Sequence, residues 1–126
     1  MSIQSNLEQA ANGLVMMSES EYPFEYISTE DTTLSPAVAL KLGGKPEGTP
    51  VTTTTLDHLL RNLTDPASGT VSPAQANQYQ QMAVALKSNL AELTVYRVGE
   101  VQVDALILGL TPEGTVAGIR TKLIET

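Results

Sequence analysis

Two short acidic stretches hold the residues of this sequence that could do chemistry. One comprises Ser18, Glu19, Ser20 and Glu21, and the other is the closing pair Glu125–Thr126. Carboxylates presented on ordered backbone can imitate phosphate for a basic site, or bind a hard cation such as Mg²⁺, which prefers oxygen ligands. An α-carboxylate on Thr126 would be ionised at neutral pH, with the threonine hydroxyl beside it as a second donor. A solvated connecting loop is the simpler interpretation of residues 18–21.

No catalytic constellation accompanies these carboxylates. His58 is the single histidine, and neighbouring helical positions such as Asp57 and His58 point apart. The absence of cysteine excludes a thiolate metal site, and Gly43-Gly44-Lys45 lacks the spacing of a phosphate-binding loop. Two glutamates in a loop do not fix the carboxylate separation that a glycosidase needs. We therefore predict an exposed or capping His58, no enzyme, and no cofactor of the protein's own.

The charge balance limits the classes of partner. The 126 residues predict one domain, 1–126, and carry 7 Lys and Arg against 14 Asp and Glu, a net charge of -7. This balance disfavours direct nucleic-acid binding, which needs a basic surface, and it suits a basic protein partner. The N-terminus lacks the pattern of a signal peptide, and no apolar stretch has the length of a membrane span. We expect a cytoplasmic protein that does not bind membranes.

The last third of the chain predicts the sheet that positions Glu125–Thr126. Val101–Leu110 is a nearly continuous apolar run, typical of a strand buried on both faces. Thr111–Gly114 has turn chemistry, and Thr115–Ile124 returns with β-branched residues, which predicts a hairpin. A strand running to Ile124 would hold the closing pair at the end of the sheet.

The first part of the chain predicts a helix and then a strand around the acidic loop. Apolar spacing favours a helix over residues 3–12, with a capping box at Ser5 or an earlier cap at Ser2. Leu14–Met17 is expected to be buried, and Tyr22–Ile27 to form the first strand. Residues 18–21 would then lie between two buried apolar segments.

Local signals predict the remaining elements. Ser35 and Pro36 begin a helix that Gly43-Gly44 ends, and Ser72 and Pro73 begin the longest helix, through residue 92. A strand is expected over residues 51–55 and a short helix over residues 56–60. The inward stripe of the longest helix is predicted to be Tyr79, Met82, Ala83, Leu86, Leu90 and Leu93.

At these same residues the sequence resembles the nuclease A inhibitor family. The resemblance is carried by Gly13–Glu25, by Val95–Ile119 and by the closing Thr121–Thr126, with Lys87–Leu90 as a further anchor. Residues 28–78 match this pattern poorly. Several motifs in one order are more specific than any single motif.

The resemblance implies a fold and a function. The fold would be an α/β/α sandwich with a central, mostly antiparallel sheet, similar to the pathogenesis-related-1 architecture. The function would be inhibition of a basic, sugar-nonspecific, Mg²⁺-dependent DNA/RNA endonuclease, bound 1:1 with its active-site cleft plugged. By resemblance, Thr126 would meet the Mg²⁺ of the nuclease and Glu19 its basic phosphate-binding residues. Ser18, Ser20, Glu21 and Glu125 would complete the partner-binding surface.

One departure from the family keeps a second function open. The family's inhibitor also uses a tryptophan from its middle region, and this chain has no tryptophan. The alternative is a non-catalytic binding module of the same fold that recognises a different basic or metal-bearing partner.

Overall fold

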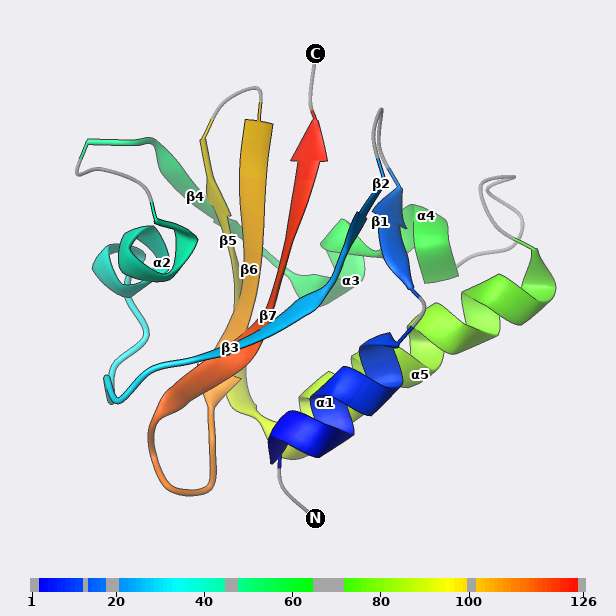
Figure 1. The fold of residues 1–126 in the computed structure, drawn as a ribbon, viewed down its shortest axis with the longest axis horizontal. Coiled ribbons are helices and arrows are strands. Elements are labelled where there is room, and N and C mark those ends of the chain that lie inside the picture. The colour runs from blue at the N-terminus through cyan, green and yellow to red at the C-terminus, as the bar shows by residue number, and fades with distance from the viewer. Residues whose placement is uncertain are drawn as a thin grey trace.

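A five-stranded antiparallel sheet forms the centre of the computed structural model, which describes residues 3–12, 14–17, 21–44, 48–64, 72–99 and 102–124 (Figure 1). The strand order is β3-β7-β6-β5-β4, and the strands β1 and β2 form a separate antiparallel hairpin. The strands are β1 Val15–Met17, β2 Glu21–Pro23, β3 Glu25–Ser28, β4 Val51–Thr54, β5 Ala91–Val98, β6 Gln102–Leu110 and β7 Val116–Ile124.

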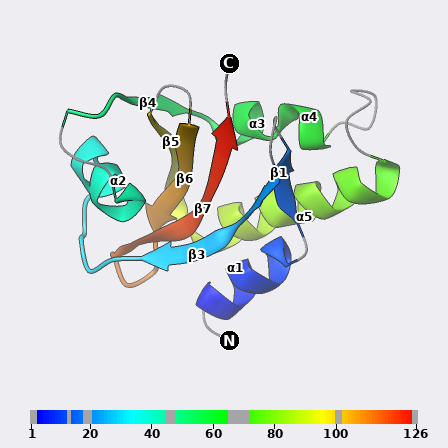
Figure 2. The same cartoon turned by 45° about the horizontal axis from the view of Figure 1, so that its top comes forward.

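Helices cover both faces of the sheet. The helix α2, Pro36–Gly43, lies on one face, and the other helices lie on the opposite face (Figures 1 and 2). That second layer contains α1 Ile3–Ala11, α3 Leu56–Leu59, α4 Arg61–Thr64 and α5 Pro73–Asn89. The predicted α+β fold with an antiparallel sheet between helices is confirmed. The similarity to the pathogenesis-related-1 architecture stays a prediction.

The central strand β6 is buried on both faces, as its apolar run predicts. Leu106 and Leu108 pack in the core beneath α2, whereas Ala105 and Ile107 belong to the larger core beneath α1 and α5. Residues 103–109 are all buried, and β6 pairs with β5 on one side and β7 on the other. The predicted hairpin is confirmed, with Leu106 opposite Arg120.

Helix caps form where short-range chemistry predicts them. The Ser35 hydroxyl accepts a hydrogen bond from the Val38 amide at 3.3 Å, and Gly44 closes α2 with φ 68°, in the left-handed region that favours glycine. Ser72 begins α5 with a capping box completed by Gln75. In both cases the deciding residues are neighbours in the sequence.

The predicted helix start at residue 3 is confirmed, but one predicted cap and one predicted helix end are wrong. The helix α1 already includes Ile3, so Ser5 lies inside the helix and is not its cap, and Ser2 lies outside the described residues. The helix α5 ends at Asn89 and not at residue 92, because Leu90 is extended and Ala91 already pairs with Leu110 of β6. Sheet pairing at this point overrides the helical spacing of the apolar residues.

The single strand predicted over Tyr22–Ile27 is two strands with different partners. The strand β2 pairs with β1, and β3 pairs with β7, with Phe24 between them. Pro23 has no amide hydrogen to donate to a ladder, which suits a strand end. The apolar segment before the acidic stretch is therefore β1, half of a hairpin.

Candidate functional site

The structure describes little of the predicted site itself. Ser18, Glu19 and Ser20 lie outside the described residues, as does the pair Glu125–Thr126. Glu21 is the first residue of β2, and its side chain is not described. The described residues that lead into both stretches nevertheless define where the two stretches leave the fold.

The hairpin β1–β2 and the strand β7 end on the same side of the molecule. Met17 is paired with Glu21, the hairpin pair nearest the acidic stretch. The last described residue of β7, Ile124, is paired with Gln102 at the start of β6. Figure 1 shows the end of β1, the start of β2 and the end of β7 on the same side of the molecule, and Figure 2 shows the same for β1 and β7. The described elements that flank the two acidic stretches are therefore neighbours.

A side-chain hydrogen bond connects β7 to this hairpin. Thr121 is 2% exposed, and its hydroxyl donates to the carbonyl oxygen of Tyr22 at 3.2 Å. The two residues are 99 positions apart in the sequence. Along β7, Thr121 follows the alternation of the buried residues Ala117 and Ile119, so a polar residue stands at an inward position. Sequence reasoning missed this residue, although that alternation was a readable signal.

Arg120 attaches β7 to the opposite layer. Its guanidinium donates to the Glu25 carboxylate at 2.8 Å and to the carbonyl oxygen of Leu42 at 3.1 Å. Leu42 lies in the last turn of α2, where carbonyl groups lack helical partners and a cation is favourable. The ion pair is partly exposed, with 33% of the Arg120 and 57% of the Glu25 side chain accessible, so its geometry matters more than its small stabilisation.

A cavity of about 240 Å³ lies beside these contacts. Two carboxylates, Glu25 and Asp104, and two cations, Arg120 and Lys122, line it and balance in formal charge. Asp104 is 4% exposed, opposite Lys122 in the β6–β7 register. The remaining lining residues are Tyr22, Pro23, Gly43 and Thr121.

Among the residues that the structure describes, no group of three or more His, Cys, Asp or Glu side chains could hold a metal ion. Within the same residues, no helix combines the length and apolarity that crossing a membrane requires.

The amino-acid sequence matches the family model of nuclease A inhibitor-like proteins over residues 1–126. The chain belongs to this family. The match confirms the resemblance carried by the two ends of the sequence, and it extends across residues 28–78, where the motifs are weakest. A comparison with curated proteins finds no match.

His58 has the surroundings predicted for it in this member of the nuclease A inhibitor-like family. Its side chain is exposed, and its backbone amide donates to the Thr55 hydroxyl at 3.1 Å as part of the α3 cap. The neighbouring Asp57 turns away to pair with Lys87 at 3.0 Å. His58 and Asp57 therefore do not form a general-base pair.

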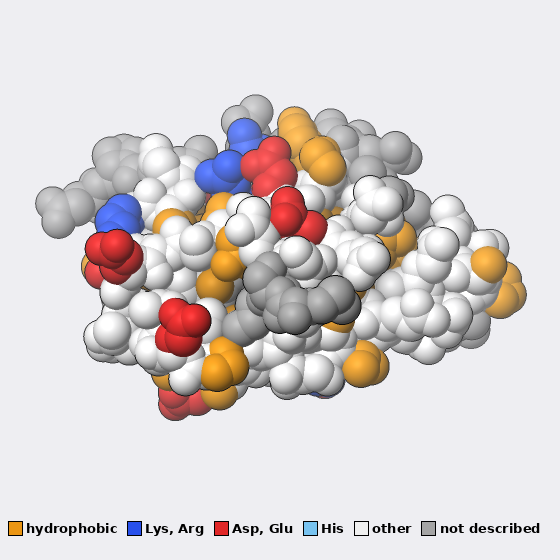
Figure 3. Space-filling view, turned by 60° about the horizontal axis from the view of Figure 1, so that its bottom comes forward, with side chains coloured by type: hydrophobic (Ala, Val, Ile, Leu, Met, Phe, Trp, Pro, Cys, Tyr) orange, Lys and Arg blue, Asp and Glu red, His pale blue; other side chains and the backbone are white. Residues whose placement is uncertain are grey.

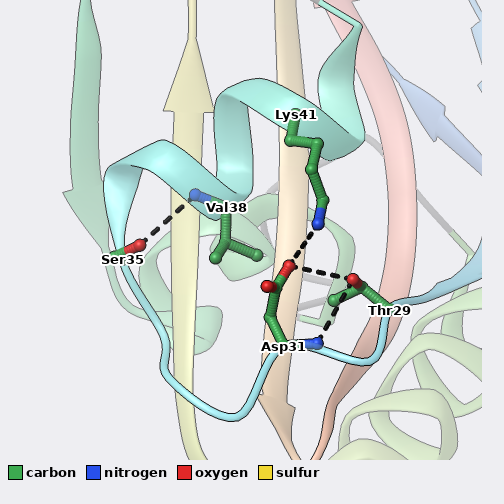
Figure 4. A network of polar contacts seen from close by, with 5 residues as sticks. All are labelled: Thr29, Asp31, Ser35, Val38 and Lys41. Atoms are coloured by element: carbon green, nitrogen blue, oxygen red, sulfur yellow. Dashed lines mark hydrogen bonds and ion pairs between the residues drawn. The ribbon is translucent and has the colours of Figure 1, made fainter.

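A further polar network, which sequence reasoning missed, lies in the connection between β3 and α2 (Figure 4). The Asp31 carboxylate accepts hydrogen bonds from the Lys41 ammonium group and from the Thr29 hydroxyl, the latter at 2.9 Å. The hydrogen bond from Lys41, with a smaller contribution from Thr29, holds the pKa of Asp31 below its usual value. The Asp31 carbonyl also accepts from the Val116 amide at 2.9 Å, at the start of β7. This network lies at the opposite end of β7 from Ile124 and serves to fix α2.

Charged side chains are unevenly distributed over the surface that Figure 3 shows. They gather over the sheet side of that view, whereas the surface over α5 is almost uncharged. The helix α5 contains Lys87 as its one charged residue. That helical surface is therefore a poor match for a strongly basic partner.

Proposed function

We propose that the protein inhibits a basic, sugar-nonspecific, Mg²⁺-dependent DNA/RNA endonuclease by filling its active-site cleft. The observation that carries the proposal is membership of the nuclease A inhibitor-like family over residues 1–126. The net charge of -7 supports it, because an acidic inhibitor is attracted to a cleft built for polyanionic substrates. The protein acts by occlusion and carries out no reaction of its own.

The proposed contacts come from two stretches whose flanking described strands end on one side of the molecule. Glu19 takes the place of a substrate phosphate on basic groups of the nuclease, and Ser18, Ser20 and Glu21 surround it. Thr126 offers oxygen donors to the Mg²⁺ that the nuclease holds, with Glu125 beside it. The common direction of the β1–β2 hairpin and the end of β7 supports a single shared cleft, because both stretches have to reach one active site.

The test is a titration of nuclease activity at fixed Mg²⁺. A nonspecific endonuclease of the ββα-metal type digests double-stranded DNA while the protein is added in increasing amounts. The proposal predicts loss of activity that is complete near one equivalent and is not restored by excess Mg²⁺, which excludes chelation. Activity that persists at excess protein would contradict the proposal.

The absence of tryptophan is the reason to test the second candidate function, binding without inhibition. The family's inhibitor uses such a residue, so a protein without it could bind a basic, metal-bearing partner of another class. Binding of the metal-loaded nuclease without inhibition, measured by calorimetry, would favour that alternative.

A further inference from the structure

The end of β7 extends beyond one of its two neighbouring strands. The strand β3 accompanies β7 from Ala117 to Arg120, where Glu25 is the last partner. The strand β6 continues beside β7 to Ile124. Among the described residues, Thr121–Ile124 therefore has a strand on one side only, and other contacts must position its second side.

The Thr121 hydroxyl supplies such a contact. The chain that would have continued β3 turns away at Phe24, and β2 pairs with β1 instead. The hydroxyl bridges that separation by donating to the carbonyl oxygen of Tyr22 at 3.2 Å, inside a region where Thr121 is 2% exposed. The adjacent Arg120 bonds to Glu25 and to α2 on the other face. Two consecutive residues thus attach β7 to both flanking layers.

We propose that Thr121 is a positioning residue that fixes the β1–β2 hairpin relative to the end of β7, so that both enter the nuclease cleft as one rigid unit. This role rests on the proposed function. Its physical basis is preorganisation, because two contact segments held at the correct separation lose less conformational freedom on binding than two independently moving ones. Thr121 itself does not touch the partner.

Two substitutions separate the hydrogen bond from the packing of this buried side chain. Thr121→Val keeps the shape and removes the hydroxyl, whereas Thr121→Ser keeps the hydroxyl and removes a methyl group. Both disturb a buried site and lower the melting temperature. We expect inhibition to be weakened about tenfold by Thr121→Val and to stay within about threefold of the parent for Thr121→Ser, since one hydrogen bond corresponds to roughly one decade in affinity. Thr121→Ala provides a second hydroxyl-free variant if the valine protein does not fold.

A double-mutant cycle gives a readout that loss of stability would not move. Glu19→Ala and a one-residue extension after Thr126 are combined in the parent and in Thr121→Val. In the parent, where the two segments form a rigid unit, we expect the losses of binding free energy from the two changes to be non-additive, because each change removes the benefit of binding both segments together. In Thr121→Val, which lacks the hydroxyl, we expect the two losses to approach additivity.

The possible failures are distinguishable. Equal inhibition by parent and Thr121→Val, or equal weakening by the valine and serine variants, overturns the role of Thr121 and leaves the inhibitor function standing. A parent protein that inhibits no endonuclease overturns both proposals.

Discussion

From Ala117 to Arg120, β7 lies between two strands, whereas from Thr121 to Ile124 only β6 continues beside it within the described residues. The first segment is tightly packed: a Cβ atom added to Gly118 would stand 1.8 Å from the carbonyl oxygen of Ile107. In the second segment, the Thr121 hydroxyl attaches the strand to the hairpin, and Lys122 lines the cavity beside it. The first segment is thus part of the packed sheet, whereas under the proposed function the second segment positions the contact residues that follow it.

The largest expected effect is on the first segment. Gly118→Ala places a methyl group against strand backbone that cannot rotate away, so the β6–β7 ladder must separate locally. We expect the free energy of unfolding to fall by about 4 kcal/mol or more, which would lower the melting temperature by roughly 10 °C or more. Gly44→Ala is the control, since its φ of 68° is unfavourable for alanine but nothing lies within 4 Å of the new Cβ. A Gly118→Ala protein no less stable than Gly44→Ala would break the comparison.

The next effect concerns the acidic stretch at the hairpin. Glu19→Ala is expected to weaken inhibition by about 2 to 5 kcal/mol of binding free energy, because a basic group of the nuclease is left buried without its partner. Glu21→Ala is expected to cost less if Glu21 lies at the edge of the proposed interface. Inhibition assays report the affinity, and melting curves should be unchanged in both variants. Unaltered inhibition by Glu19→Ala would remove Glu19 from the interface.

The smallest effect is expected at the other end of β7. In the folded protein the pKa of Asp31 lies below its usual value of about 3.9, so its contribution to stability is present above that value and is lost as the pH falls through the lowered folded pKa. Asp31→Asn should therefore lower the melting temperature by about 1–2 °C at pH 7, as expected for an exposed pair, and by less below pH 4. The same variant should inhibit as tightly as the parent. A difference in melting temperature that grows on acidification would contradict this sign.

The sequence predicts those parts of the fold that short-range chemistry decides. Ser35 and Ser72 cap helices because their partners are three residues away, and the apolar run in β6 indicates burial on both faces by itself. The start of β5 could not be predicted in this way. Leu90 and Leu93 continue the helical spacing of α5, but the chain there pairs with β6 as a strand. The register of this pairing is irregular around Glu92, whose φ is 54°.

The candidate site could be predicted less completely than the fold from the residues alone. Carboxylates at Glu19 and Glu125 indicate a partner with basic or metal chemistry. Their placement in a nuclease cleft comes from the family resemblance alone and stays a prediction. The contact between Thr121 and Tyr22 joins positions 99 apart, and the network at Asp31 depends on the turn of the chain into α2. The alternation along β7 marks Thr121 as an inward polar residue, but its partner Tyr22 follows only from the assembled fold.

Two measurements on variants of the chain end test most directly whether Thr126 acts in inhibition without contributing to the stability of the fold. One residue is added after Thr126, or Thr126 is deleted, and the inhibition constant and melting temperature are determined on the same preparations. Extension moves the α-carboxylate away from Thr126. Deletion withdraws it by about 3.3 Å, one strand step, and directs it to the opposite face of the strand. Mg²⁺ requires short contacts in near-octahedral geometry, so neither displaced carboxylate can bind it in the same way. We predict weakened inhibition with an unchanged melting temperature in both variants. An extended protein that inhibits as tightly as the parent would contradict the assignment of Thr126 to the metal.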